Sequence, residues 1–206
     1  RHDGLMTENP AADGPATPDD GSAPGTGGAW LLATFRVSSS HPFVLDGRDV
    51  PGAVRELEDV VGLVEREGVA VRGWYDVTGF RSDADLLLWL TARAAEDLQW
   101  GYRELRRTSM LRPLVRSGSS IAEAEARPSG DAAGWLAVLG LSDARHGEDD
   151  GGRGGLAAVD VSAGERIEAV EADTADELFG RLRGAVSAPI HLGRLIAPVE
   201  IVEVLQ

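Results

Sequence analysis

The sequence predicts an α+β protein built from two ferredoxin-like repeats in tandem, a dimeric α+β barrel within one chain, with the second repeat shortened. Three observations favour this fold. Strand and helix signals in residues 29–125 follow the order β-α-β-β-α-β. Similar signals return in residues 134–206, but without the stretch that would form the first helix. Residues 1–28 are rich in proline and glycine and poor in apolar residues, so we expect a disordered tail.

Each element of the first half has a local signal. Residues 30–37 mix continuous and alternating apolar positions, as strands do. From Pro51 onward, apolar residues recur at spacings of three and four until Gly68, which predicts an amphipathic helix. The same reasoning predicts strands at 69–77 and 85–91, a helix at 94–112 and a strand at 115–124.

The second half repeats these signals at two different offsets. The segment from Gly134 matches that from Ala29 at an offset of 105, whereas Ile167–Leu178 matches Leu87–Leu98 at an offset of 80. About 25 residues are therefore missing where the first helix belongs, and the acidic, glycine-rich segment 143–155 stands there instead. We expect a strand at 156–161, a helix at 174–186 that begins with a Thr174/Glu177 capping box, and extended structure at 190–205 broken at Pro198.

The composition excludes several classes of function. Acidic residues outnumber basic ones by 34 to 20, and the net charge of -14 would repel nucleic acid and an anionic membrane surface. Without cysteine the chain has no disulfide, thiolate metal site or cysteine nucleophile. No apolar run approaches the roughly 20 residues that span a bilayer. We expect a cytoplasmic protein whose partners include neither nucleic acid nor membrane.

Three segments carry a family resemblance: Gly73–Thr91 (GWYDVTGFRSDADLLLWLT), Ala95–Leu98 and Arg106–Arg112. They resemble the chlorite dismutase-like family and, within it, the actinobacterial coproheme decarboxylases. The resemblance is specific over residues 30–117 and thin over 118–206. It implies two ferredoxin-like halves, heme or coproheme bound in the second half, peroxide-dependent oxidative chemistry, and a homo-oligomer that is a ring of five subunits.

The second half departs from the family at the cofactor site. Family members carry a proximal histidine on the helix that is missing here, and only His146-Gly147 resembles their Glu-His-Gly motif. The family segment with a distal histidine and a radical-forming tyrosine is replaced by Ala122–Gly130, which has neither residue. The two tyrosines of the chain, Tyr75 and Tyr102, both lie in the first half. The family route of decarboxylation therefore lacks its tyrosine, and no catalytic residue is assigned.

Two histidines and three arginines are the candidate cofactor-binding residues. His146 is the candidate axial ligand of heme iron, with His191 as the alternative. A competing interpretation makes His146 a solvated residue of an acidic loop, and the carboxylates that follow it could instead complete a non-heme metal site. Arg106, Arg107 and Arg112 could bind porphyrin propionates, or they could pair with acidic residues across a subunit interface.

Two classes of function remain open. The first is a heme- or coproheme-dependent enzyme, whose pocket would lie between the Trp135 strand, the 156–161 strand and the 174–186 helix. The alternative is a heme-free, or non-heme-metal, relative that serves as a structural or small-molecule-binding module. Family resemblance favours the enzyme, whereas the lost helix and the absent tyrosine favour the module.

Overall fold

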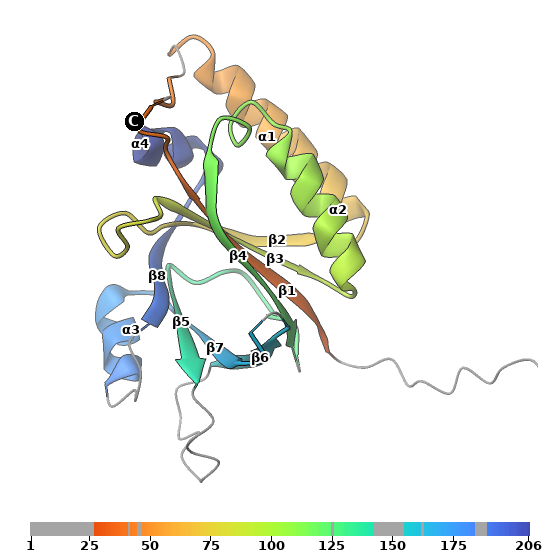
Figure 1. Ribbon diagram of the computed structural model, residues 1–206, viewed down its shortest axis with the longest axis vertical. Coiled ribbons are helices and arrows are strands. Elements are labelled where there is room, and N and C mark those ends of the chain that lie inside the picture. Colours follow the sequence, from red (N-terminus) through yellow and green to blue (C-terminus); the bar gives the residue numbers. More distant parts are fainter. Residues whose placement is uncertain are drawn as a thin grey trace, which may run out of the picture.

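Eight strands form a closed barrel in the computed structural model, which describes residues 27–40, 42–44, 47–124, 126–141, 155–161, 163–183 and 189–206. The strands are β1 (Gly28–Arg36), β2 (Ala70–Asp76), β3 (Leu86–Ala92), β4 (Val115–Ala124), β5 (Trp135–Leu141), β6 (Leu156–Asp160), β7 (Arg166–Ala172) and β8 (Pro189–Ile196). The helices are α1 (Val50–Arg66), α2 (Ala95–Arg106), α3 (Ala175–Leu182) and α4 (Ile201–Leu205), with a 3₁₀ turn, Pro198–Glu200, directly before α4. The order around the barrel is β1-β3-β2-β8-β5-β7-β6-β4, with antiparallel neighbours (Figure 1).

Each half of the chain contributes four strands in the same order. The first half gives β4-β1-β3-β2 and the second gives β8-β5-β7-β6, which is the ferredoxin-like order in both. The edge strands then pair across the halves, β2 with β8 and β4 with β6. The predicted α+β class and tandem ferredoxin-like fold are confirmed. The boundaries 29–125 and 134–206 remain our proposed division of the chain.

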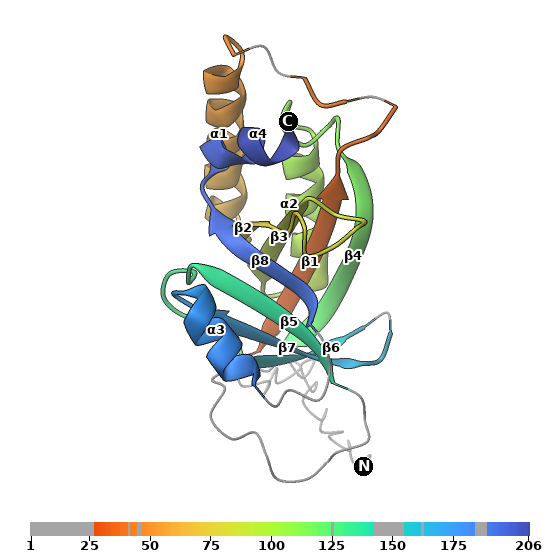
Figure 2. The ribbon, with the colours of Figure 1, turned by 90° about the vertical axis from the view of Figure 1, so that its left-hand side faces the viewer.

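Helices cover the two half-sheets unequally. α1 and α2 lie side by side over the outer face of the first half-sheet, with α4 near them, whereas α3 is the described helix on the second (Figure 1 and Figure 2). Residues 37–69 link β1 to β2 and contain α1, while only residues 142–155 link β5 to β6. The second repeat is thus shortened, as predicted. Residues 1–26 and 142–154, which hold most of the predicted tail and loop, lie outside the described residues.

None of the described helices is long and apolar enough to cross a membrane.

Strand alternation separates the barrel interior from the outer layers. On β3, Leu87 and Trp89 face the interior, whereas Leu86 and Leu88 face the helices. Trp89 meets Trp30 of β1 edge to face, with 5.2 Å between the ring centroids. All five side chains are fully buried, so the interior is a packed core at this level.

The structure corrects the predicted alignment of the two repeats, in which Trp135 is equivalent to Trp30. Ala29 lies opposite Ala92 on β3, and Trp135 lies opposite Ala172, the repeat equivalent of Ala92, on β7. Trp135 therefore occupies the position of Ala29 and not that of Trp30. Because successive strand residues face opposite sides, Trp30 points into the barrel and Trp135 points to the outer side.

The predicted ends of two helices are wrong. α2 ends six residues before the predicted residue 112, because the chain turns where Thr108 Oγ1 donates to the carbonyl oxygen of Leu105 at 2.8 Å. α3 begins as predicted, with Thr174 Oγ1 accepting the N–H of Glu177 at 3.2 Å. It ends four residues before the predicted residue 186.

Residues 190–196 are extended as β8 and the strand ends before Pro198, as predicted, but the residues from Pro198 onward are helical and not extended. Pro198 begins the 3₁₀ turn, where its fixed φ suits a helical start and its missing N–H leaves no bond unmade. Glu200 Oε2 accepts the N–H of Ala197 at 2.8 Å, which stabilises the turn. α4 then buries Ile201 and Leu205 in the core beneath α1 and α2.

A nearly buried ion pair joins β2 to β7 beside the linker between the halves. Arg72 donates to Glu171 through Nε at 3.2 Å and through Nη2 at 2.6 Å, and the two side chains are 10% and 14% exposed. The same guanidinium donates to the carbonyl oxygens of Gly130 and Asp131 at 2.6 and 2.9 Å. Tyr75 Oη also donates to Glu171, at 3.4 Å. This network holds the linker against both halves.

Replacing the acid of this pair tests its contribution to stability. Glu171→Gln leaves the Arg72 charge nearly buried and unpaired, so we expect the free energy of unfolding to fall by about 3 kcal/mol. Urea denaturation measures it. Glu104→Gln is the matched control, because its partner Arg107 has a side chain 73% exposed and the loss should be below about 0.5 kcal/mol. Equal losses in the two variants would contradict the role given to Arg72 and Glu171.

Candidate functional site

The outer face of the second half-sheet is where the family resemblance implies a cofactor. Its apolar core lies directly beneath α3, where Leu178 is fully buried together with Ala137, Leu139 and Val170. On the neighbouring strand β6, Val159 is 43% exposed. The described part of this face therefore consists of a packed region under α3 and an outer margin along β6 and β7.

The outward-facing residues of strand β7 change from apolar to charged at that margin. In the first half, Leu86 and Leu88 of β3 are fully buried in the core that includes α1. The equivalent positions of β7, eighty residues later, are Arg166 and Glu168, both partly exposed. The next two outward positions of β7, under α3, remain apolar and buried. Two outward positions of β7 are thus charged and partly exposed, whereas the equivalent positions of the first half are apolar and buried.

His191 faces away from this surface. It lies opposite Val138, a residue of the interior cluster, so its imidazole is directed into the barrel. Its Nδ1 is buried with no hydrogen-bond partner in the described part of the chain. Burial, reinforced by the Arg81 guanidinium, lowers the pKa of His191 to about 4, although the Asp83 carboxylate acts in the opposite direction. The ring is neutral at pH 7, yet it is not placed to bind an iron on the outer face.

The three candidate arginines lie in the first half, at and just after the end of α2. The guanidinium of Arg106 lies 5.4 Å from the ring centroid of Phe35 and donates to two carbonyl oxygens of the turns after α2. Arg107 pairs with Glu104 at 2.6 Å, and Arg112 is exposed. The structure does not bring these arginines together with the described histidine or with the outer face of the second half-sheet.

His146 and the carboxylates that follow it lie outside the described residues, so their role as ligands stays a prediction. Among the residues that the structure describes, no group of three or more His, Asp or Glu side chains could hold a metal ion. The outward positions of β5, β6, β7 and β8, and the whole of α3, carry no His, Tyr or Met. The described surface therefore offers heme iron no axial ligand.

Neither tyrosine reaches this surface. Tyr75 lies in the barrel interior, where burial and then the Glu171 carboxylate raise the pKa of its phenol far above the ordinary value. Tyr102 lies on α2, with its ring stacked 6.2 Å from that of Phe35. Together with the charged margin of β7 and the absence of a ligand on the described face, this means that the described residues do not fit a heme group.

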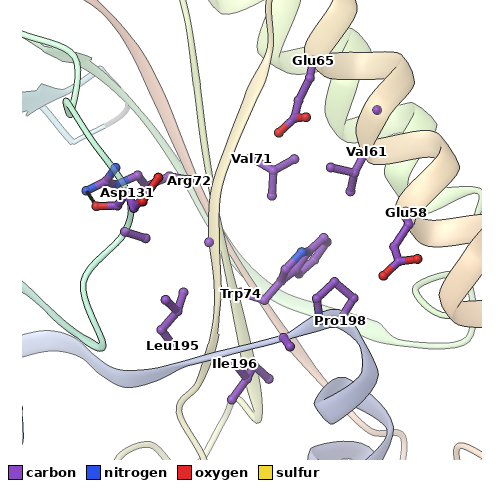
Figure 3. A pocket seen from close by; sticks show the side chains of 14 residues that line it. Glu58, Val61, Glu65, Val71, Arg72, Trp74, Asp131, Leu195, Ile196 and Pro198 are labelled. Carbon is purple, nitrogen blue, oxygen red and sulfur yellow. Dashed lines mark hydrogen bonds between the residues drawn. The ribbon is translucent and has the colours of Figure 1, made fainter. Parts of the chain in front are cut away.

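A pocket of about 560 Å³ lies on the opposite half of the molecule, at the seam between β2 and β8 and beside α1 (Figure 3). We call it the seam pocket. Glu58, Gly62 and Glu65 line it from α1, Trp74 lines it from β2, and Pro198 closes it from the 3₁₀ turn. Its volume is within the range of small-molecule sites.

A second pocket, of about 780 Å³, lies between β4 and the start of α2. Its charged lining residues have both signs, Arg93 against Glu96 and Glu123, and it contains no aromatic side chain. The seam pocket is the better candidate site, because Trp74 lines it and its one basic lining residue, Arg72, is already paired with Glu171.

The seam pocket is not among the sites that the sequence predicts, although α1 carries a signal for it. Glu58, Gly62 and Glu65 recur at spacings of four and three, which places them in one stripe beside the apolar stripe of α1. A tryptophan in a predicted strand is by default a core residue, and Trp74 is only 4% exposed. The pocket also needs Pro198, which only the barrel brings next to α1.

Comparisons with known proteins agree with the fold and match a known family in part of the chain. Residues 52–129 match the family model described as chlorite dismutase, and the match ends before the second half. Over 65 residues the chain is 42% identical to the coproheme decarboxylase of Mycolicibacterium smegmatis. This segment is 32% of the present chain and 28% of that protein, so the chain matches well under half of its relative's length. The resemblance to the chlorite dismutase-like family is confirmed, as is the divergence of the second half.

Solved structures extend the likeness to nearly the whole chain. Chlorite dismutase from Candidatus Nitrospira defluvii in complex with imidazole aligns with a TM-score of 0.65 and 16% identity, covering 87% of this chain and 95% of that one. A variant of the same enzyme in complex with cyanide aligns with a TM-score of 0.59 and 17% identity, over 87% and 95% of the two chains. At this identity the likeness establishes the shared fold.

The buried histidine predicts a pH dependence of stability. Folded His191 stays neutral down to about pH 4, whereas the unfolded chain takes up this proton near pH 6.5. Between these values the unfolded state binds the extra proton, so stability falls as the pH falls. At pH 5 the loss from this residue is about 2 kcal/mol. Urea denaturation at pH 7 and pH 5 should show this part of the loss in the native protein and not in His191→Leu; identical pH profiles would contradict it.

Proposed function

We propose that this protein is a heme-free relative of the chlorite dismutases that acts as a small-molecule-binding module, with its site in the seam pocket. The observation that carries the proposal is the replacement of Leu86 and Leu88 by Arg166 and Glu168 at equivalent positions of the second repeat. A porphyrin plane needs an apolar wall, and charged side chains at the margin where the helix is missing do not supply one.

The ligand inventory supports the same proposal. Iron in heme requires an axial ligand such as an imidazole, a thiolate or a phenolate. The chain has no cysteine, and its two tyrosines lie elsewhere. His191, the histidine that the structure describes, is directed into the barrel. A porphyrin on this face would therefore depend on His146 for a strong axial bond.

The seam pocket supplies what the second half lacks. In family members the resemblance places the cofactor ligand on the first helix of the second repeat. The first repeat has kept its own first helix, α1, and the pocket lies between this helix and strand β2. The binding position within the repeat is thus retained in the other half, with a different set of side chains.

A heme- or coproheme-dependent enzyme is the second candidate. Leu141, Leu182 and Leu192 stay partly exposed around α3, and these side chains could contact a porphyrin. In this candidate His146 binds the iron, and the bound group supplies peroxide-dependent oxidation of the porphyrin or of a small organic substrate. The matched coproheme decarboxylase is the relative whose name points in this direction.

The assembly and the cellular location of the protein are proposed from the family resemblance. We propose a homo-oligomer, a pentamer, that works in the cytoplasm. Light scattering tests the assembly, because a single chain has a mass of 21.7 kDa and a ring of five has five times that mass.

Reconstitution with heme decides between the two candidates. The purified protein is titrated with hemin and with coproheme, and the Soret region is compared with that of the free porphyrins. We expect no shifted Soret band, and no difference between the native protein and His146→Ala. His191→Leu is the matched histidine control. A coordinated Soret band that disappears in His146→Ala and persists in His191→Leu would overturn the heme-free proposal and favour the enzyme.

A further inference from the structure

We infer that the seam pocket binds a small organic cation, an alkylammonium ion that also carries a hydrogen-bond acceptor. The inference rests on the proposed function, since it names the class of ligand for that pocket. Three properties of the pocket carry it: its carboxylates, an unused indole N–H, and an apolar gap opposite a glycine.

The charged groups that are free to meet a ligand in the pocket are all acidic. Glu58 and Glu65 extend from α1 toward β2 (Figure 3), and Asp131 contributes from the linker. No ion pair or side-chain hydrogen bond among the described residues uses these three carboxylates. Glu58 and Glu65 lie seven residues apart, about 10 Å along the helix axis. An ammonium group can therefore meet a carboxylate at either end of the pocket.

The one basic residue of the lining does not neutralise them. Arg72 is held by both oxygens of Glu171 and by the carbonyl oxygens of Gly130 and Asp131. Its charge is thus compensated within the barrel. The remaining charged lining residues, Glu58, Glu65 and Asp131, are acidic, which disfavours carboxylates and phosphates as ligands.

Trp74 provides a second, independent indication of a ligand. Its side chain forms the centre of the pocket wall (Figure 3), and the residue is 96% buried, with only 4% exposed. None of the hydrogen bonds between described residues uses its indole N–H. This donor is not among the fully buried polar atoms that lack a partner, so it stays accessible, and a ligand oxygen could accept its hydrogen bond. The indole face also attracts a cation.

The remaining wall favours an alkyl chain. Val61 and Val71 face each other across the pocket with Pro198 at its side, and Leu195 lines it from the other side of β2 (Figure 3). Gly62 sits between Glu58 and Glu65 on the same helical stripe and adds no side chain of its own to the wall. A β-carbon there would meet only the end of the flexible Arg66 side chain, at 3.4 Å, so packing does not require glycine at this position.

Three matched probes test the inference: hexylammonium, its hydroxylated analogue with an alcohol at the far end, and neutral hexanol. The protein is labelled with fluorotryptophan and observed by fluorine NMR, which gives one signal for each of its five tryptophans. Loss of one signal in Trp74→Phe assigns Trp74. We expect the hydroxylated ammonium to shift this signal at the lowest concentration, hexylammonium to need more, and hexanol to need the most.

Charge variants with a matched control complete the test. Glu58→Gln and Glu65→Gln should each weaken hexylammonium binding by about threefold, as expected for one partly exposed ion pair. Asp59→Asn removes the same charge from the same helix at an exposed position outside the lining, and should leave the affinity unchanged. Gly62→Leu fills the gap and should abolish binding of all three probes while circular dichroism stays native.

The outcomes separate this inference from the function on which it rests. If hexanol binds at Trp74 as tightly as the ammonium ions, the cation preference is wrong and the small-molecule module stands. An equal loss in Asp59→Asn and Glu58→Gln would also overturn it, because the effect would be long-range charge. If no probe moves the Trp74 signal, or if the signal responds only to protein concentration because a second copy fills the pocket, both the inference and the binding module fall. Heme reconstitution tests the heme-free proposal separately.

Discussion

Closure of the barrel is the constraint on which the rest of this structure depends. Each half-sheet has two edges, and pairing β2 with β8 and β4 with β6 leaves neither half with an open edge. Closure also divides every strand into an inner and an outer set of side chains, so the Arg72–Glu171 pair can link the halves at the end of the interior. Because β8 pairs with β2, the chain that follows β8 lies over the first half, where Pro198 and α4 pack near α1.

A closed barrel explains how the second repeat tolerates a short link between β5 and β6, where the described residues include no helix. The interior core is shared by both halves, with Trp30 and Trp89 from the first and Leu136 and Ile167 from the second. A helix on the outer face adds a separate layer, and removing it exposes only the outward residues of the strands below. The polar side chains on the outer margin of β7 remove the cost of that exposure. The outward side chains of the second repeat thus suit the short link between β5 and β6.

The sequence determined most elements because their signals are local. Apolar spacing predicted α1, and alternation predicted β4 at its observed bounds. The alignment of the two repeats was different. The similar sequences around Trp30 and Trp135 indicated that these two residues are equivalent, whereas strand pairing shows that Trp135 is equivalent to Ala29. The C-terminal segment was misjudged since its apolar residues suit a strand or a helix equally, and packing against the first half decides. The seam pocket joins residues more than a hundred positions apart, from Glu58 to Pro198, and no local pattern can show that contact.

The two repeats together suggest where function lies in this molecule. A ligand site between the first helix and the second strand of a repeat needs both elements, and only the first repeat has both among the described residues. There the helix presents carboxylates to an apolar cleft with an indole at its centre, a combination that suits a cation and not an anionic porphyrin. In the second repeat the outward side chains match a surface without that helix. The chemistry that each repeat can support thus follows from the presence or absence of one helix.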